Sequence, residues 1–170
     1  DLWAASPPST YYCQAGAHLI FNLSASNDIV GKCDYRKKLI EQQSARCICG
    51  YIYVSAAPGE STTDLVYGGH AVAAENGKIL AESERFDFGG QSIITEIDTG
   101  LISHDRSKNN VFNGIGTFGN YRKVQYNLNE IEIISLHRKV DPYPFVPGNE
   151  SKREKRCREI FEIQSTGLAK

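Results

Sequence analysis

The sequence predicts a layered α/β fold in which helices cover a sheet. Two observations support this prediction. Short apolar runs, several rich in Ile, Tyr or Val, are interleaved with stretches whose composition is typical of helices. In addition, Asn76-Gly77 stands between two apolar runs, and this dipeptide is the strongest short-range signal of a β-hairpin. At 170 residues the chain is long enough for one such domain with a tail.

The first half of the chain predicts two helices and two strands. Pro7-Pro8-Ser9 opens a short helix, because proline suits a first helical turn, and Gly16 ends it. Residues 17–23 form an apolar run that predicts a buried strand, followed by a polar loop at 24–28. Residues 31–46 are charge-rich and contain no internal Gly or Pro, which predicts a helix, and residues 47–56 predict a strand.

The second half begins with Pro58-Gly59, which breaks that strand. Residues 67–74 and 78–86 predict the two arms of the hairpin, and residues 92–97 a further short strand. Residues 103–119 are rich in Asn, Gly and Ser, which predicts an irregular segment. Residues 130–136 alternate in part between polar and apolar, which favours a strand.

After residue 139 the character of the sequence changes. Residues 140–148 hold three of the six prolines and predict an extended linker. Beyond it, an apolar stripe follows helical spacing on an otherwise charged segment, through Cys157, Ile160, Phe161, Gln164 and Leu168. We therefore predict a boundary between residues 1–139 and residues 140–170, the latter ending in an amphipathic helix.

Composition and charge exclude several classes of partner. The net charge is −1 and the pI about 6.5, so there is no electrostatic reason to expect nucleic acid or an anionic membrane. No apolar run approaches the ~20 residues of a membrane span, and residues 1–3 lack signal-peptide features. The five cysteines lack metal-like spacing and are interpreted as reduced thiols, which predicts a cytoplasmic protein. The four histidines are widely scattered, so we expect no metal site.

Several motifs resemble the nitrilase-type glutaminase domain of glutamine-dependent NAD synthetases. They are Asp1-Leu2-Trp3 with Pro7-Pro8-Ser9, Asn22 to Asn27 (NLSASN), Gly31-Lys32, Gln43-Ser44-Ala45-Arg46, Gly59 to Leu65 (GESTTDL), and Leu80 to Phe86 (LAESERF). The resemblance implies that residues 1–139 are the C-terminal half of that domain and part of an αββα sandwich with a mixed sheet. It further implies that residues 140–170 lead toward a synthetase domain.

The family's chemistry follows from this resemblance. A cysteine thiolate attacks the side-chain amide of glutamine, a glutamate acts as general base and acid, and a lysine stabilises the oxyanion. In the family's order all three precede Asp1, so we expect no catalytic residue in this chain and no activity from the chain alone. The parent protein would use ATP and Mg²⁺ to amidate deamido-NAD, and this segment would hold no cofactor.

Three residues match substrate-contact positions of the family. Ser26 matches a contact to the amino-acid end of glutamine, although a turn serine that bonds its own backbone is the alternative. Lys32 matches a cationic position and could pair with the α-carboxylate, although a solvated charge is the default for a surface lysine. Trp3 would pack beside the pocket or belong to the core.

The expected partners are glutamine, the parent's synthetase domain and further copies of the chain. Two other classes of function stay open: a stand-alone nitrilase-type amidase, and a non-catalytic assembly module. For the isolated chain we predict oligomerisation or precipitation, because half a core and an open sheet edge would be exposed. Glu60 and Asp64 are interpreted as structural, with a possible role at a subunit contact or in the route of ammonia.

Overall fold

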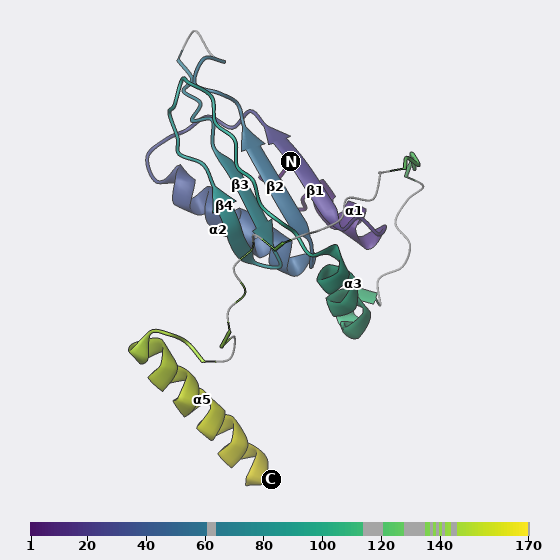
Figure 1. Cartoon of the computed structure of the whole chain (residues 1–170), viewed down its shortest axis with the longest axis vertical. Coiled ribbons are helices and arrows are strands. Elements are labelled where there is room, and N and C mark those ends of the chain that lie inside the picture. The colour runs from purple at the N-terminus through teal and green to yellow at the C-terminus, as the bar shows by residue number, and fades with distance from the viewer. Residues whose placement is uncertain are drawn as a thin grey trace. The chain divides into compact units, whose positions relative to one another are not determined.

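The computed structural model describes residues 1–60, 64–113, 121–127, 135–136, 138, 140, 142–143 and 146–169. The chain divides into two compact units, Asp1–Ser135 and Leu136–Lys170. The first unit holds the sheet, and the second holds the helix α5 (Glu150–Leu168) (Figure 1). The assignment of residues 1–139 to a glutaminase half and of 140–170 to a connector stays a prediction.

The sheet of the first unit is mixed. Its four strands are β1 (Leu19–Ser24), β2 (Gly50–Ser55), β3 (Ala71–Glu75) and β4 (Lys78–Glu82), in the order β1-β2-β3-β4. β1 and β2 are parallel, whereas β3 pairs antiparallel with both β2 and β4. A helix, α2 (Lys32–Arg46), connects the two parallel strands. The predicted α/β class with a mixed sheet is confirmed.

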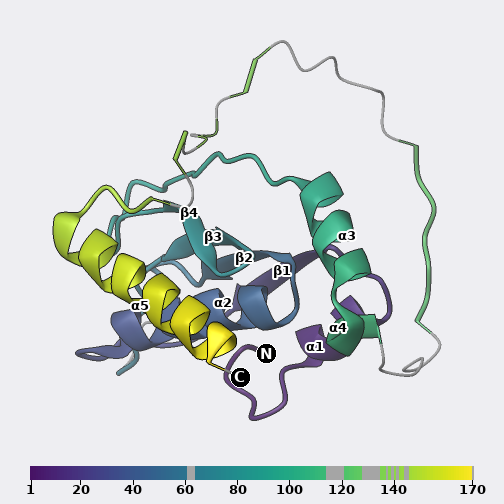
Figure 2. The ribbon, with the colours of Figure 1, turned by 90° about the horizontal axis from the view of Figure 1, so that it is seen from below.

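One face of the sheet is covered by α2, which contacts β2, β3 and β4 (Figure 2). The short helix α1 (Pro8–Gln14) contacts β1, and both helices were predicted close to these bounds. Side chains alternate along each strand, so every second residue faces this helix layer. The buried core is made of Leu2, Cys13, Ile20, Ile40, Cys47, Cys49, Tyr51, Tyr53, Val72 and Ala74.

The strand predicted for residues 17–23 is present as β1, but the prediction that it is buried is wrong for one of its two faces. Ile20 is buried against the helix layer, but Phe21 is 71% exposed and Leu23 is 83% exposed. These two side chains alternate with Ile20 and therefore lie on the opposite face of the sheet. Among the described residues, β1 is an edge strand. An apolar run cannot by itself distinguish a strand buried on both faces from a strand with one uncovered apolar face.

The predicted hairpin is confirmed. Its turn lies at Asn76 and Gly77, whose φ angles of 44° and 85° are both in the left-handed region. This region is accessible to glycine without strain and is tolerated by asparagine, which is why the dipeptide predicts the turn. The Gly77 amide also donates to Ser44 Oγ of α2 at 2.9 Å, which fixes the turn to the helix layer.

The strand predicted for residues 47–56 begins three residues later than expected. Cys47, Ile48 and Cys49 form the turn between α2 and β2, with Ile48 at a φ of 44°. Cys47 and Cys49 are both buried in this turn. A β-branched residue rarely adopts positive φ, so composition gave no sign of this turn.

Two predictions for residues 92–113 are also wrong. Residues 92–97 form no strand, because no described strand pairs with them. Residues 103–113 are not irregular, since α3 (Thr99–Lys108) and α4 (Asn110–Asn113) cover most of them. Asp98 caps α3 by accepting from the Leu101 amide at 2.8 Å, and such a cap favours a helix despite weak propensities.

Several predicted segments fall outside the described residues. These are residues 114–119 of the predicted irregular segment and residues 130–134 of the last predicted strand, while residues 135 and 136 are in no strand. The described residues of the predicted linker 140–148 lie in no helix or strand, and the terminal helix is confirmed as α5. Among the helices of the described residues, none has both the length and the apolar character that a membrane span requires.

Candidate functional site

Lys32 stands at the start of α2, and its side chain is partly exposed. Its ammonium donates to the Asn27 carbonyl oxygen at 2.7 Å and to Asn27 Oδ1 at 3.0 Å. The same nitrogen lies 4.8 Å from the centroid of the Trp3 ring, within the range of a cation–π contact. Two of the three predicted site residues, Trp3 and Lys32, are therefore in direct contact.

The third, Ser26, precedes Asn27 in the loop that leaves β1, and it is buried. Its carbonyl oxygen accepts a hydrogen bond from Ser55 Oγ at 3.4 Å. The Ala56 amide donates to the Ser24 carbonyl oxygen at 2.8 Å, so the loop is tied to the end of β2 at two points. Ser26 thus belongs to the same region as Lys32 and is joined to it through Asn27.

Trp3 lies beside the core rather than in it. Its ring is half-buried and packs against Tyr35 of α2, with ring centroids 5.9 Å apart. Within the described residues, the buried Trp3 Nε1 has no hydrogen-bond partner. Trp3 is not part of the buried core cluster, and its ring lies next to the Lys32 ammonium. Its contact with substrate stays a prediction.

Behind Lys32, α2 carries a buried polar network that the sequence did not predict. Arg36 is fully buried and donates to Asp28 Oδ1 at 2.8 Å. Arg36 Nη1 lies 3.2 Å from His70 Nδ1, and His70 Nε2 lies 3.0 Å from Glu82 Oε1. Lys37 completes the network through Glu82 Oε2 at 3.1 Å. The network joins the loop after β1 to α2, to His70 just before β3, and to β4.

Hydrogen bonding fixes the tautomer of His70. A guanidinium can only donate, so Nδ1 must accept from Arg36 and Nε2 must carry the proton that goes to Glu82. Burial lowers the pKa of His70, and the neighbouring Arg36 and Arg85 charges lower it further against the opposing effect of Glu82. For Glu82, burial raises the pKa, but hydrogen bonds from Lys37 and His70 outweigh it and lower the pKa overall. His70 is therefore a neutral connector between two charges.

One set of side chains in the described part of the chain has the chemistry of metal ligands: Cys33, His70 and Glu82, whose ligand atoms lie within 4.8 Å of one another. Sequence reasoning missed it because strand pairing brings together residues that are far apart in the chain. A metal would need a free lone pair on His70, but Nδ1 accepts from Arg36 and Nε2 then carries the proton that goes to Glu82. The Lys37 ammonium on Glu82 opposes a second cation as well. The donor set does not fit a metal as arranged.

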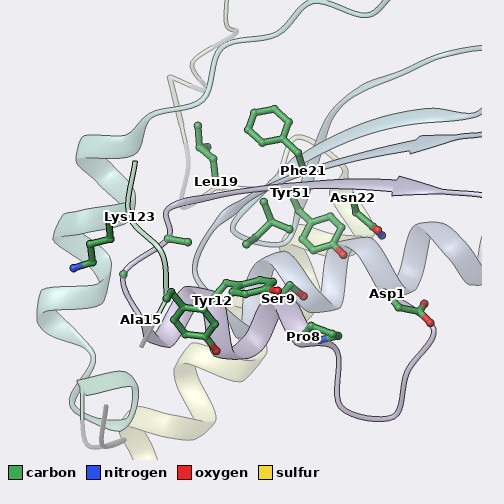
Figure 3. A pocket seen from close by; sticks show the side chains of 14 residues that line it. Asp1, Pro8, Ser9, Tyr12, Ala15, Leu19, Phe21, Asn22, Tyr51 and Lys123 are labelled. Atoms are coloured by element: carbon green, nitrogen blue, oxygen red, sulfur yellow. The ribbon is translucent and has the colours of Figure 1, made fainter. Parts of the chain in front are cut away.

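Two of the cavities among the described residues of the first unit lie close to the sheet. One of about 700 Å³ lies between α1 and β1, where Ser9 and Tyr12 project toward Asn22 and Tyr51 (Figure 3). Burial raises the pKa of Tyr51 to about 12. The other, of about 880 Å³, is lined by both signs of charge, including Asp28, Asp34, Glu82, Lys37 and Arg85. Neither is lined by Trp3, Ser26 or Lys32.

All five cysteines are free thiols, and Cys13, Cys47 and Cys49 are buried in mutual contact. The hydrogen bond with Cys47 raises the pKa of the Cys13 thiol, and burial contributes to the rise. A thiol with a raised pKa and no access to solvent is a poor nucleophile. Cys13 therefore acts as a core residue of α1.

Comparison with known proteins gives the family context. No family model matches the chain. The glutamine-dependent NAD(+) synthetase of Mycobacterium bovis is 36% identical over 180 aligned positions, which cover 99% of this chain and 26% of that protein. Over nearly its whole length, this chain is similar to glutamine-dependent NAD(+) synthetases. The resemblance predicted from the sequence motifs is confirmed.

Among solved structures, the glutamine-dependent NAD(+) synthetase of Cytophaga hutchinsonii matches 45% of this chain and 13% of its own, at 32% identity and a TM-score of 0.43. Nit3 of Saccharomyces cerevisiae, a member of branch 10 of the nitrilase superfamily, matches 61% of this chain and 36% of its own, at 23% identity and a TM-score of 0.48. The chain spans about a quarter of the length of the synthetases that it resembles in sequence.

Proposed function

We propose that this chain is part of the glutaminase domain of a glutamine-dependent NAD synthetase and forms one wall of the glutamine pocket. The parent protein hydrolyses glutamine to ammonia and uses ATP, with Mg²⁺, to amidate deamido-NAD to NAD. Support comes from similarity over 99% of the chain to synthetases named for this activity. We assign no residue of this chain to ATP or Mg²⁺, which would act in the synthetase part.

The proposal rests mainly on the contacts that hold the Lys32 ammonium in place. A lysine that served only solubility would extend into water, but this one is fixed by Asn27 and the Trp3 ring and remains partly exposed. A fixed, accessible ammonium suits a carboxylate, and glutamine presents one at its α-carbon. The N-cap of α2 is Gly31, which has no side chain to cap the helix, so the helix dipole favours an anion at the same end.

Ser26 and Trp3 have supporting roles in this proposal. The Ser26 hydroxyl can donate to or accept from the amino-acid end of glutamine. Trp3 supplies the wall against which the Lys32 side chain lies. The chain supplies substrate contacts and no catalytic residue, so the nucleophilic cysteine, the general base and the oxyanion lysine must come from the rest of the domain. We further propose a cytoplasmic, homo-oligomeric parent.

The test uses the full-length protein that carries this segment. NAD formation is measured with glutamine and, separately, with ammonium chloride, which bypasses glutamine hydrolysis. Lys32→Ala is expected to raise KM for glutamine about ten- to hundredfold, the value of one charge-assisted hydrogen bond of about 1.5–3 kcal/mol. The ammonia-dependent rate should stay unchanged. Lys38→Ala, which removes an exposed lysine of the same helix, is the matched control.

Two results would contradict the proposal. If the unaltered protein formed NAD from neither nitrogen source, the family function would be lost. If Lys32→Ala left KM for glutamine within twofold of the control, the wall formed by this segment would not bind the substrate carboxylate.

A further inference from the structure

Asn27 holds the Lys32 ammonium with two different acceptors. Its carbonyl oxygen lies 2.7 Å from Nζ and its side-chain Oδ1 lies 3.0 Å from the same nitrogen. A lysine ammonium has three protons and no acceptor, so Asn27 takes two of the three. Among the described hydrogen bonds of Lys32, the third proton has no acceptor. One N–H therefore remains for a ligand.

The backbone around Asn27 is itself anchored on both sides. On one side, the Ser26 carbonyl oxygen accepts from Ser55 Oγ. On the other side, the Asp28 amide donates to the Val66 carbonyl oxygen at 2.7 Å, and the Asp28 carboxylate pairs with the buried Arg36 at 2.8 Å. Asn27 is thus held in place within an otherwise irregular loop, and its two hydrogen bonds restrict the flexible Lys32 side chain.

We propose that Asn27 is the positioning residue of the carboxylate site: it orients the Lys32 ammonium so that a single N–H is presented to the α-carboxylate of the substrate. This inference rests on the proposed function and adds a residue that neither the sequence motifs nor the comparisons assign to it. A free lysine would lose rotamer entropy when it bound a carboxylate. The hydrogen bonds to Asn27 already restrict the rotamer of Lys32 before the substrate binds, so little further entropy is lost on binding.

The amide of Asn27 is neutral, so it holds the Lys32 ammonium without placing a negative charge beside it. A carboxylate at this position would accept the same protons but would neutralise Lys32 and repel the substrate. Asn27→Asp therefore separates positioning from charge. It preserves a side-chain acceptor for the ammonium, yet it should bind glutamine no better than Asn27→Ala does.

The experiment compares L-glutamine with L-glutaminamide, which lacks the α-carboxylate, in the full-length protein. Asn27→Ala is expected to raise KM for glutamine about five- to tenfold, with kcat within twofold, and to leave KM for glutaminamide unchanged. Asn27→Asp should raise KM for glutamine by at least as much. Asn110→Ala, an exposed asparagine of the same unit, is the control and should change neither.

The outcomes distinguish this inference from the proposed function. If Lys32→Ala raises KM for glutamine but Asn27→Ala does not, the positioning role is refuted while the glutamine site stands. If Asn27→Ala raises KM for glutamine and KM for glutaminamide by the same factor, Asn27 has only a structural role, and the inference also fails. If Lys32→Ala changes neither substrate's KM, the proposed function fails together with it.

Discussion

Arg106 should be a major determinant of the stability of the first unit. Its side chain is buried, with only 6% of the residue exposed, and it reaches from α3 into the two turns that precede β1 and β2. Nε donates to the Ile48 carbonyl oxygen at 2.9 Å, and Nη2 donates to the carbonyl oxygens of Ala17 at 2.8 Å and Cys47 at 3.0 Å. One guanidinium thus satisfies three main-chain acceptors, including that of a residue with positive φ.

The structure sets the expected magnitude. A hydrogen bond to a charged group contributes about 1.5–3 kcal/mol, and removing the donor leaves buried carbonyls without a partner. Because the three bonds share one side chain they do not add fully, and Arg106→Ala should lower the free energy of unfolding by about 3–5 kcal/mol. Arg106→Lys keeps the charge but loses the planar guanidinium, so its free energy of unfolding should lie between those of wild type and Arg106→Ala.

Urea unfolding followed by the fluorescence of Trp3, the only tryptophan, measures this loss directly. Arg46→Ala removes an exposed arginine at the end of α2 and should stay within about 0.5 kcal/mol of wild type. An Arg106→Ala variant as stable as Arg46→Ala would refute the role assigned to this side chain. If Arg106→Ala alone failed to fold, this would agree with the role assigned to Arg106, and the loss of unfolding free energy would then be measured with Arg106→Lys.

Two further predictions concern pH and association. The pKa of His70 is lowered in the folded state, so the unfolded state binds a proton first as pH falls below 6.5, and the stability present above pH 6.5 is lost on acidification. His70→Asn should therefore reduce the loss of stability between about pH 6.5 and 5. Part of the pH dependence should persist in this variant because the pKa of His18 is also lowered. Exposed Phe21 and Leu23 on the uncovered face of β1 should drive the isolated chain to self-associate, and Phe21→Ser with Leu23→Lys should reduce the sedimenting mass; a monomeric wild-type chain would contradict this.

The sequence predicted most of the local structure wherever a local signal decides it. The Asn76-Gly77 turn and the start of α1 at Pro8, after Pro7, each follow from backbone preferences of a few residues. In contrast, α3 depends on the Asp98 cap and on the long-range bonds of Arg106, so a composition rich in Asn and Ser concealed it. The exposed face of β1 was missed because apolar residues on it look the same in sequence as core residues.

In the candidate site, too, some features were predicted from the sequence and others depend on contacts that the sequence does not reveal. Trp3 and Lys32 were proposed through family resemblance, and the structure brings them into contact, but nothing local predicted that Asn27 would hold the ammonium. The Arg36–His70–Glu82 network was likewise hidden, because pairing of β3 with β4 brings His70 and Glu82 together across 12 residues of sequence. The scatter of histidines along the chain was therefore a poor guide to their neighbours in space.

A structure of the full-length protein with a bound glutamine analogue tests the central claim most directly. We expect one α-carboxylate oxygen about 2.8 Å from Lys32 Nζ, with both Asn27 hydrogen bonds retained. A carboxylate bound elsewhere, with Lys32 facing solvent, would contradict the role of this segment as a wall of the glutamine pocket.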